Sequence, residues 1–408
     1  MAPTTLYLML SFLADFIFTM IFTVSQIYYV INVGMSPLQL VLAGTILETS
    51  VFLFEVPTGV IADLKSRRLS IIIGYFIMGF GFLMEGALPF FWSVALAQVL
   101  WGLGYTFTSG ATEAWIADEI GSSNVGDTYL RSSQWGNAGA LVAIPLAVLL
   151  GNIQVNLPIL IGGAALIGLG ALLVLSMKET GFTPAPAGNR STWKQMANTI
   201  AQARDLVRRQ PVLLGLLGIA FFSGLYSEGL DRLWTPHLIE NFEFPLAGTL
   251  TIVTWFGVIR AVGLLLSILG TWIVRERVDL QLAHRIGNLS RFASLGIILG
   301  LLSFGLTTVF WLALIFYWLI TMLRSIRAPL HTTWVNLNVD DPQVRATLLS
   351  VNSQTDAIGQ IAGGPVIGLV GNFSIRAALA VSALLLTPVI ALYTRALRGE
   401  HERGEGSH

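Results

Sequence analysis

Residues 54–70 read FEVPTGVIADLKSRRLS. The apolar run carries a glutamate, a proline and a glycine, and it ends with Asp63 four residues before the adjacent Arg67 and Arg68. Only 11% of the whole chain is charged, whereas about 25% of an ordinary soluble domain is charged. An acid and a basic cluster at the end of such a run therefore indicate a place where the chain leaves an apolar environment.

The rest of the chain predicts an integral membrane protein. It has 408 residues, of which 54% are hydrophobic, and a mean hydropathy of +0.72. Apolar stretches of the roughly 20 residues that cross a hydrocarbon core recur along it, and only helices satisfy their backbone polar groups within one such stretch. We expect an all-α membrane protein with twelve spans, at residues 6–32, 38–62, 69–88, 92–118, 131–150, 157–177, 212–238, 246–273, 286–306, 309–328, 346–370 and 375–395.

Composition argues against several other classes of protein. The net charge of zero argues against a nucleic-acid partner, and the absence of cysteine excludes thiol catalysis, disulfides and cysteine-based metal sites. The five histidines are scattered, two of them near the end at His401 and His408, so we expect no metal site, no cofactor and no enzyme. The first apolar stretch is longer than the hydrophobic region of a signal peptide, so we expect it to stay in the membrane.

The lysines and arginines predict the orientation. Twelve spans place alternate loops on the same side, and one set of loops, which includes Lys65, Lys178 and Arg275 and leads to Arg395 at the tail, contains these residues. The other set, around residues 33–37, 87–91, 151–156, 239–245, 307–308 and 371–374, contains no Lys or Arg. Because positive loops stay in the cytoplasm, we expect both termini to be cytoplasmic.

The second half of the chain repeats the first. Gln134, Gly139, Pro145, Gly151 and Asn152 all recur at one offset (365 − 145 = 220 for the prolines). Such a repeat predicts two pseudo-symmetric six-helix bundles with the substrate path at their interface. We place the bundles at residues 1–177 and 212–396, a cytoplasmic linker at 178–211 and a tail at 397–408. The linker reads as a tether followed by an amphipathic helix on the inner leaflet, with a solvated linker as the alternative.

The opening stretch carries a family resemblance. Gly59, Asp63, Arg67 and Arg68 match the Gly-x-x-x-Asp-x-x-Gly-Arg-Arg/Lys loop between helices 2 and 3 of the major facilitator superfamily, with Ser66 where the family usually has glycine. Helix count, repeat and central linker extend the resemblance to the whole chain.

This resemblance implies a gate at the cytoplasmic side. It places Asp63 against the N-terminus of helix 11, where free N–H groups favour an anion. It pairs Arg67 or Arg68 with Asp118 or Glu119 and adds Glu55 to the gate. The alternative is that the arginines only anchor the topology.

Four ionisable residues are expected near the middle of the membrane. A rise of 1.5 Å per residue puts Asp15, Glu48, Arg260 and Asp356 roughly 14–21 Å from their entry faces, and a charge there costs about 2.5–3.5 kcal/mol. We expect Arg260 to pair with one acid and the other carboxyls to be proton carriers.

The resemblance places helices 1, 4, 7 and 10 around the cavity, which favours Asp15 and also Glu113 as proton carriers. Glu48 and Asp356 fall on helices that resemble the family's interface-forming pair. For these two, a structural hydrogen bond between helices is the alternative.

Further polar residues are assigned to the substrate cavity. Glu228, Asp231 and Arg232 lie three and four residues apart and are expected to cluster on one helix face, as an outer gate, a binding site or a water-exposed salt bridge. We expect Arg327 to extend to the membrane interface. The remaining cavity assignments are Gln26, Tyr105, Arg260 and Arg324.

Within the superfamily the chain resembles bacterial drug:proton antiporters, through the loop motif and Trp101-Gly-Leu-Gly104. Two departures are Gln98, where these antiporters have arginine, and Ile144 where they have the glycine of a Gly-Pro pair. The expected function is proton-coupled efflux of amphipathic small molecules by a monomer in the bacterial inner membrane. The alternatives are a selective carrier for a metabolite or siderophore-like anion and a non-transporting receptor on the same fold.

Overall fold

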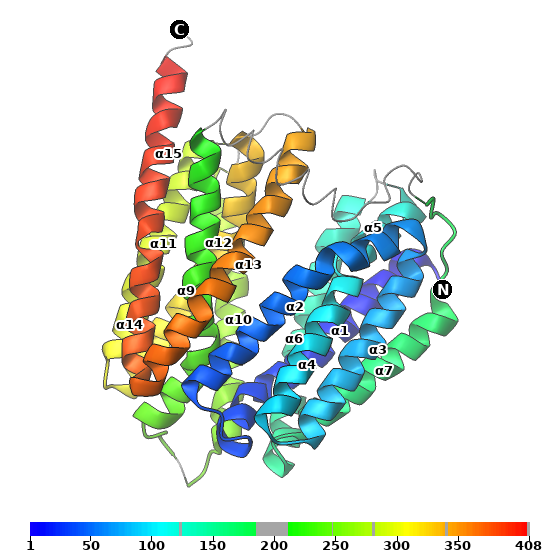
Figure 1. The fold of residues 1–408 in the computed structure, drawn as a ribbon, viewed down its shortest axis with the longest axis horizontal. Coiled ribbons are helices and arrows are strands. Elements are labelled where there is room, and N and C mark those ends of the chain that lie inside the picture. Colours follow the sequence, from blue (N-terminus) through cyan, green and yellow to red (C-terminus); the bar gives the residue numbers. More distant parts are fainter. Residues whose placement is uncertain (122–124, 185–210, 247, 280–281, 339–341, 406–408) are drawn as a thin grey trace. The chain divides into compact units, whose positions relative to one another are not determined.

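The computed structural model describes residues 1–121, 125–184, 211–246, 248–279, 282–338 and 342–405, and the expected amphipathic helix of the linker lies outside them. The regular elements in these ranges are all helical (Figure 1). In the first half they are α1 (Pro3–Ile27), the π-helix η1 (Tyr28–Asn32), α2 (Pro37–Leu64), α3 (Arg67–Ala87), α4 (Phe91–Thr108), α5 (Ala111–Ile120), α6 (Val125–Ile153) and α7 (Leu157–Ser176). In the second half they are α9 (Pro211–Asn241), α10 (Ile252–Arg277), α11 (Ala283–Leu306), α12 (Phe310–Asn338), α13 (Pro342–Phe373), α14 (Ile375–Leu386) and α15 (Pro388–Glu405).

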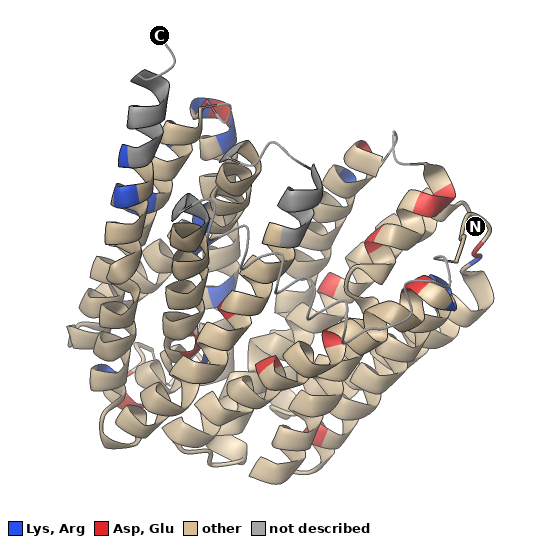
Figure 2. Ribbon diagram, turned by 45° about the horizontal axis from the view of Figure 1, so that its top comes forward, with Lys and Arg blue, Asp and Glu red and all other residues tan. Residues whose placement is uncertain are grey.

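The twelve expected spans are all found as helices. Among the described residues, nine helical segments are long and apolar enough to cross a membrane by length and composition alone. The three other spans are α4 with α5, α9, and α13. These three contain a break or several polar side chains. Figure 2 shows how sparse charge is over the ribbon as a whole.

Three of the spans are interrupted where a continuous helix was expected. Gly110, with a φ of 72°, separates α4 from α5, a conformation that glycine adopts without steric cost. Pro388 has no N–H to donate, and α14 ends at Leu386, two residues before it; the N–H and hydroxyl of the intervening Thr387 both donate to the carbonyl oxygen of Leu384. The third interruption is η1, where the expected span at residues 6–32 changes from an α-helix to a π-helix.

The chain divides into two compact units. Unit 1 comprises Met1–Met35, Ile46–Gln195 and Leu246–Ala261, and unit 2 comprises Ser36–Thr45, Met196–Pro245 and Val262–His408. The first residues of α2 therefore belong to unit 2, and the first residues of α10 belong to unit 1.

Equivalent helices pack together within each unit. In unit 1, α1 packs on α6 and α7, and α3 packs on α4 and α7; in unit 2, α9 packs on α13 and α14, and α11 packs on α12 and α14. A Cβ added to Gly139 of α6 would lie 2.3 Å from the carbonyl oxygen of Phe12. A Cβ added to Gly359 of α13 would lie 2.2 Å from that of Phe221. The sequence repeat is thus a repeat of helix packing.

Candidate functional site

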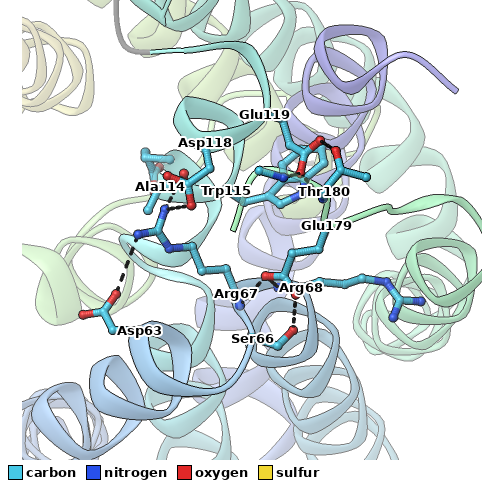
Figure 3. Close-up of polar contacts among 12 residues, drawn as sticks. Asp63, Ser66, Arg67, Arg68, Ala114, Trp115, Asp118, Glu119, Glu179 and Thr180 are labelled. Atoms are coloured by element: carbon cyan, nitrogen blue, oxygen red, sulfur yellow. Dashed lines mark hydrogen bonds and ion pairs between the residues drawn. The ribbon is translucent and has the colours of Figure 1, made fainter. Parts of the chain in front are cut away.

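The loop motif is held together by Arg67. This residue opens α3, and its Nη1 donates to a carboxylate oxygen of Asp118 and, over 2.6 Å, to the carbonyl oxygen of Ala114, both on α5 (Figure 3). Asp63, at the end of α2, lies 4.0 Å from the same guanidinium and has a side chain that is 63% exposed. The expected ion pair between Arg67 and Asp118 is therefore present, and it joins α3 to α5.

Arg68 contacts the end of α7. Its Nε donates to the carbonyl oxygen of Met177 and its Nη2 donates to that of Val174, both over 2.7 Å. These carbonyls lie at the C-terminal end of α7, where the last carbonyl groups have no partner within the helix. Of the two arginines expected to pair with Asp118 or Glu119, Arg67 therefore forms the ion pair and Arg68 caps α7.

Glu179 was missed by the sequence analysis. Its carboxylate accepts from the hydroxyl of Ser66 over 2.5 Å and from the main-chain N–H groups of Arg67 and Arg68 over 2.7 and 3.0 Å (Figure 3). An acid at this position compensates for the free N–H groups and the positive end of the α3 dipole. The sequence shows an acid just beyond the sixth span, but the residues that Glu179 contacts lie more than one hundred residues earlier in the chain.

A second acid fixes the start of the linker. Glu119 accepts from the N–H and hydroxyl of Thr180 over 2.5 and 2.6 Å and from the N–H of Gly181 over 2.9 Å. Partial burial raises the pKa of Glu119, but these three hydrogen bonds outweigh it and hold the pKa below its usual range. The indole of Trp115 donates to the carbonyl oxygen of Lys178 over 2.8 Å. Residues 178–181 are therefore bound to α5.

Two of the predicted proton carriers, Asp15 and Glu113, lie in unit 1. The carboxylate of Asp15, on α1, lies so close to α6 that a Cβ on Gly136 would be 1.9 Å from its Oδ2. Asp15 and Glu113 are both exposed in the structure, and both act electrostatically on the phenol of Tyr75.

Asp356 occupies the equivalent crossing in unit 2, with the residue types exchanged. A Cβ on Gly224 of α9 would lie 2.0 Å from the carbonyl oxygen of Asp356 on α13. The Asp356 carboxylate accepts a hydrogen bond of 2.8 Å from Gln360 and interacts electrostatically with Arg327 and Arg324. Unit 1 thus has its aspartate on the first helix of the repeat and its glycine on the fifth, and unit 2 has the reverse.

The expected cluster on α9 also includes an arginine from α12. Glu228 is 2% exposed and accepts from Nε of Arg232 over 3.4 Å, and Gly44 of α2 packs directly on it. Asp231 instead receives both Nη atoms of Arg324, over 2.5 and 2.8 Å. The charges of Asp231, Arg232 and Arg324 all act on Glu228, so the three α9 side chains interact with one another and α12 adds Arg324 to them.

Two further arginines lie in the interior of their units. Arg260 donates to the carbonyl oxygen of Phe22 in unit 1. Arg327 donates to the hydroxyl of Ser223, whose residue is 8% exposed, so the prediction that Arg327 extends to the interface is wrong. His331, one turn further along α12, contacts the Tyr393 hydroxyl and the Asn352 amide oxygen at 3.2 and 3.3 Å.

The remaining candidates are spread over unit 1. Glu48 is half-buried on α2, Glu55 is exposed one turn before Gly59, and Tyr105 is 47% exposed on α4. The Oε1 atom of Gln26 is buried and has no hydrogen-bond partner among the described residues. Within the described ranges, no group of three or more His, Asp or Glu side chains is placed to hold a metal ion.

Comparison with known proteins agrees with this architecture. The chain is 25% identical over 387 residues to the uncharacterized MFS-type transporter YxaM of Bacillus subtilis (strain 168), covering 92% of this chain and 91% of that protein. Its fold is similar to the crystal structure of the nucleoside transporter NupG, with a TM-score of 0.77, 15% identity and coverage of 97% and 99% of the two chains.

The fold is also similar to a bacterial homolog of the human lysosomal transporter Spinster, crystallised in an inward-facing and unoccupied conformation. The TM-score is 0.73, the identity is 16%, and the coverage is 97% of this chain and 96% of that chain. The model of the Major Facilitator Superfamily matches residues 7–317. The twelve-helix chain with its two pseudo-symmetric bundles therefore belongs to the Major Facilitator Superfamily.

Proposed function

We propose that this transporter exports amphipathic small molecules in exchange for protons. The observation that carries the proposal is the pair of aspartates at equivalent helix crossings, Asp15 against Gly136 and Asp356 against Gly224. A carboxyl inside a membrane protein is costly to keep as a charge. A carboxyl that is alternately wetted and desolvated takes up and releases a proton. Glu113 and Glu48 are the further candidates for this role.

The substrate class is inferred from the aromatic side chains. Phe18, Phe22, Phe82 and Trp101 form a connected group in unit 1, with the Phe22 and Trp101 ring centroids 4.8 Å apart. In unit 2, Trp234 of α9 stacks on Tyr317 of α12 with the ring centroids 4.5 Å apart, and the same two helices carry the Asp231–Arg324 pair. Flat apolar surfaces with a few polar groups suit amphipathic compounds. We assign Gln26, Tyr105, Glu228, Asp231, Arg232, Arg260 and Arg324 to substrate recognition.

The loop motif is assigned to a gate. We propose that the end of unit 1 with Gly59, Asp63, Arg67, Arg68 and Asp118 is cytoplasmic, because the positive loops lie there. Glu55 belongs to the same gate. The protein would then work as a monomer in the bacterial inner membrane, with both termini in the cytoplasm.

The test is proton flux in liposomes that contain the purified protein. A pH gradient is imposed, and a panel of lipophilic cations, neutral antibiotics and organic anions is added to the wild type, Asp15→Asn and Asp356→Asn. The matched control is Asp127→Asn, because the Asp127 side chain is 69% exposed and pairs with Arg131 on the surface. We expect several unlike compounds to dissipate the gradient in the wild type and the control, and a loss of at least tenfold in Asp15→Asn.

Other results would point elsewhere. If one compound is transported and no protons move, the proton-coupled proposal fails and the selective carrier replaces it. If Asp15→Asn and Asp127→Asn behave alike, Asp15 does not carry the proton.

A further inference from the structure

A fully buried glutamate lies at the other end of unit 1. Glu85, in the last turn of α3, is 0% exposed. It is 18 residues along the helix from Arg67 (85 − 67 = 18), so it lies roughly 27 Å from the loop motif. None of the roles assigned above uses this carboxyl.

Three side chains from two other elements surround Glu85. The hydroxyl of Tyr29 in η1 donates to Oε1 of Glu85 over 2.7 Å. The amide of Gln98 on α4 donates to the Tyr29 oxygen over 3.3 Å and lies 3.4 Å from Oε2 of Glu85. The hydroxyl of Tyr28 donates to the main-chain carbonyl of Glu85 over 2.9 Å. The carboxyl is thus part of a buried polar cluster with Tyr29 and Gln98.

The Gln98 amide can match either protonation state of this carboxyl. In the orientation found, its NH₂ group faces the carboxylate, and its Oε1 is buried without a hydrogen-bond partner among the described residues. The oxygen and nitrogen ends of an amide exchange places by rotation about one bond. After such a rotation, Oε1 can accept from the O–H of a protonated Glu85, which removes the unsatisfied acceptor. Leaving a buried acceptor unsatisfied is unfavourable, because the desolvation of that group is not compensated.

The helix that carries Tyr29 is irregular at this point. Residues Tyr28–Asn32 form a π-helix, a rare form that occurs frequently at functional sites. The same continuous helical segment carries Asp15, 14 residues earlier (29 − 15 = 14), or roughly 21 Å along the axis. A change in the hydrogen bond between Tyr29 and Glu85 would therefore act on the segment that presents Asp15.

We propose that Glu85, Tyr29 and Gln98 form a second proton-binding site. A proton taken from water at this end of the unit binds one carboxylate oxygen of Glu85, and the new O–H donates to Oε1 of Gln98. Among the described contacts, the titratable groups next to Glu85 are Tyr28 and Tyr29 of η1, and α4 contributes Gln98. Asn156, at the start of α7, donates to the carbonyl oxygen of Gly86 over 2.8 Å. Proton binding at Glu85 does not depend on the proposed function, but its role in transport rests on that function.

Infrared difference spectroscopy of the protein in lipid nanodiscs tests the site without any substrate. The spectrum of the wild type is recorded from about pH 5 to 9, the range over which buried glutamates can titrate. We expect the carbonyl band of a protonated carboxyl to appear within this range and to be absent from Glu85→Gln. The exposed Glu243 supplies the matched control, because Glu243→Gln should leave the band unchanged.

Two further variants keep the test decisive if Glu85→Gln folds poorly. Tyr29→Phe and Gln98→Leu retain the carboxyl and each remove one hydrogen-bond partner, so both should move the pH at which the band appears. A Glu85 band that is present or absent at every pH overturns the proposal. If the Glu85 band titrates but Asp15→Asn transports protons normally, the site is supported while the assignment of Asp15 fails.

Discussion

At the scale of single residues, the loop motif depends on the shape of one guanidinium. Arg67 reaches the Asp118 carboxylate and the Ala114 carbonyl from one nitrogen and approaches Asp63 with another. Arginine presents several donors in a fixed plane, whereas lysine offers a single compact ammonium group. We therefore expect arginine and lysine at position 67 to stabilise the loop motif to different extents, although their charges are equal.

We expect Arg67→Ala to lower the free energy of unfolding by about 1–3 kcal/mol, because it leaves Asp118 without its charged partner. Arg67→Lys should recover part of this loss but not all of it. Thermal unfolding of the purified protein in detergent measures both. Arg131→Lys is the control, since the exposed Arg131–Asp127 pair should contribute about 0–1 kcal/mol; equal effects at both sites would contradict the role given to Arg67.

Acid should release the start of the linker. The folded structure holds the pKa of Glu119 below its ordinary value, so the stabilisation from its contacts is complete above about pH 4.3. That stabilisation is lost as the pH falls through the lower, folded-state pKa. Hydrogen exchange at the N–H groups of Thr180 and Gly181, corrected for the intrinsic rate, should accelerate over this interval. In Glu119→Gln the protection should be lower and no longer depend on pH.

At the scale of helices, glycine sets how closely the main pairs approach. Gly139 of α6 and Gly359 of α13 face main-chain carbonyls of α1 and α9 at a distance that leaves no room for a methyl group. The backbone cannot retreat as a flexible side chain can. Each substitution must therefore push two helices apart along their length.

We expect Gly139→Ala and Gly359→Ala each to destabilise the protein by about 1–3 kcal/mol. The matched controls are Gly168→Ala in unit 1 and Gly215→Ala in unit 2, where an added Cβ would have no neighbour within 4 Å. These controls should be neutral or stabilising by up to about 1 kcal/mol, as alanine favours a helix. Thermal unfolding compares the four variants, and a Gly139 variant as stable as Gly168→Ala would be inconsistent with the close α1–α6 packing.

What the sequence predicts well is what is local in the chain. Hydrophobic length predicted the spans, and a constant offset between Pro145 and Pro365 predicted that both units pack alike. The pairs with Glu179 and Arg324 were not predicted, because each joins helices far apart in sequence and depends on how those helices turn. Glu85 was missed for a different reason, since one acid hardly changes the hydropathy of an apolar span.

At the scale of the whole molecule, the orientation in the membrane is the main prediction left to test. The chain has no cysteine, so a single introduced thiol gives an unambiguous signal. Lys65 and Thr308 are exposed residues in short connections, between α2 and α3 and between α11 and α12. The distribution of basic residues assigns them to opposite sides.

We expect a membrane-impermeant maleimide to label Thr308→Cys in intact cells and to leave Lys65→Cys unlabelled until the cells are broken open. The reverse pattern would invert the proposed topology and place both termini outside. Labelling of both positions in broken cells is the control for thiol reactivity.

The division of α2 and α10 between the two units also bears on how the protein is made. Unit 1 includes Leu246–Ala261, and unit 2 includes Ser36–Thr45. During translation, unit 1 therefore lacks one of its parts until the ribosome has passed residue 261, by which time α9 has already been synthesised. Residues 36–45, in turn, belong to unit 2, whose other residues, from 196 onward, are synthesised later. The two units therefore cannot be completed one after the other. A chain that ends in the linker contains α1 to α7 but lacks residues 246–261, which complete unit 1.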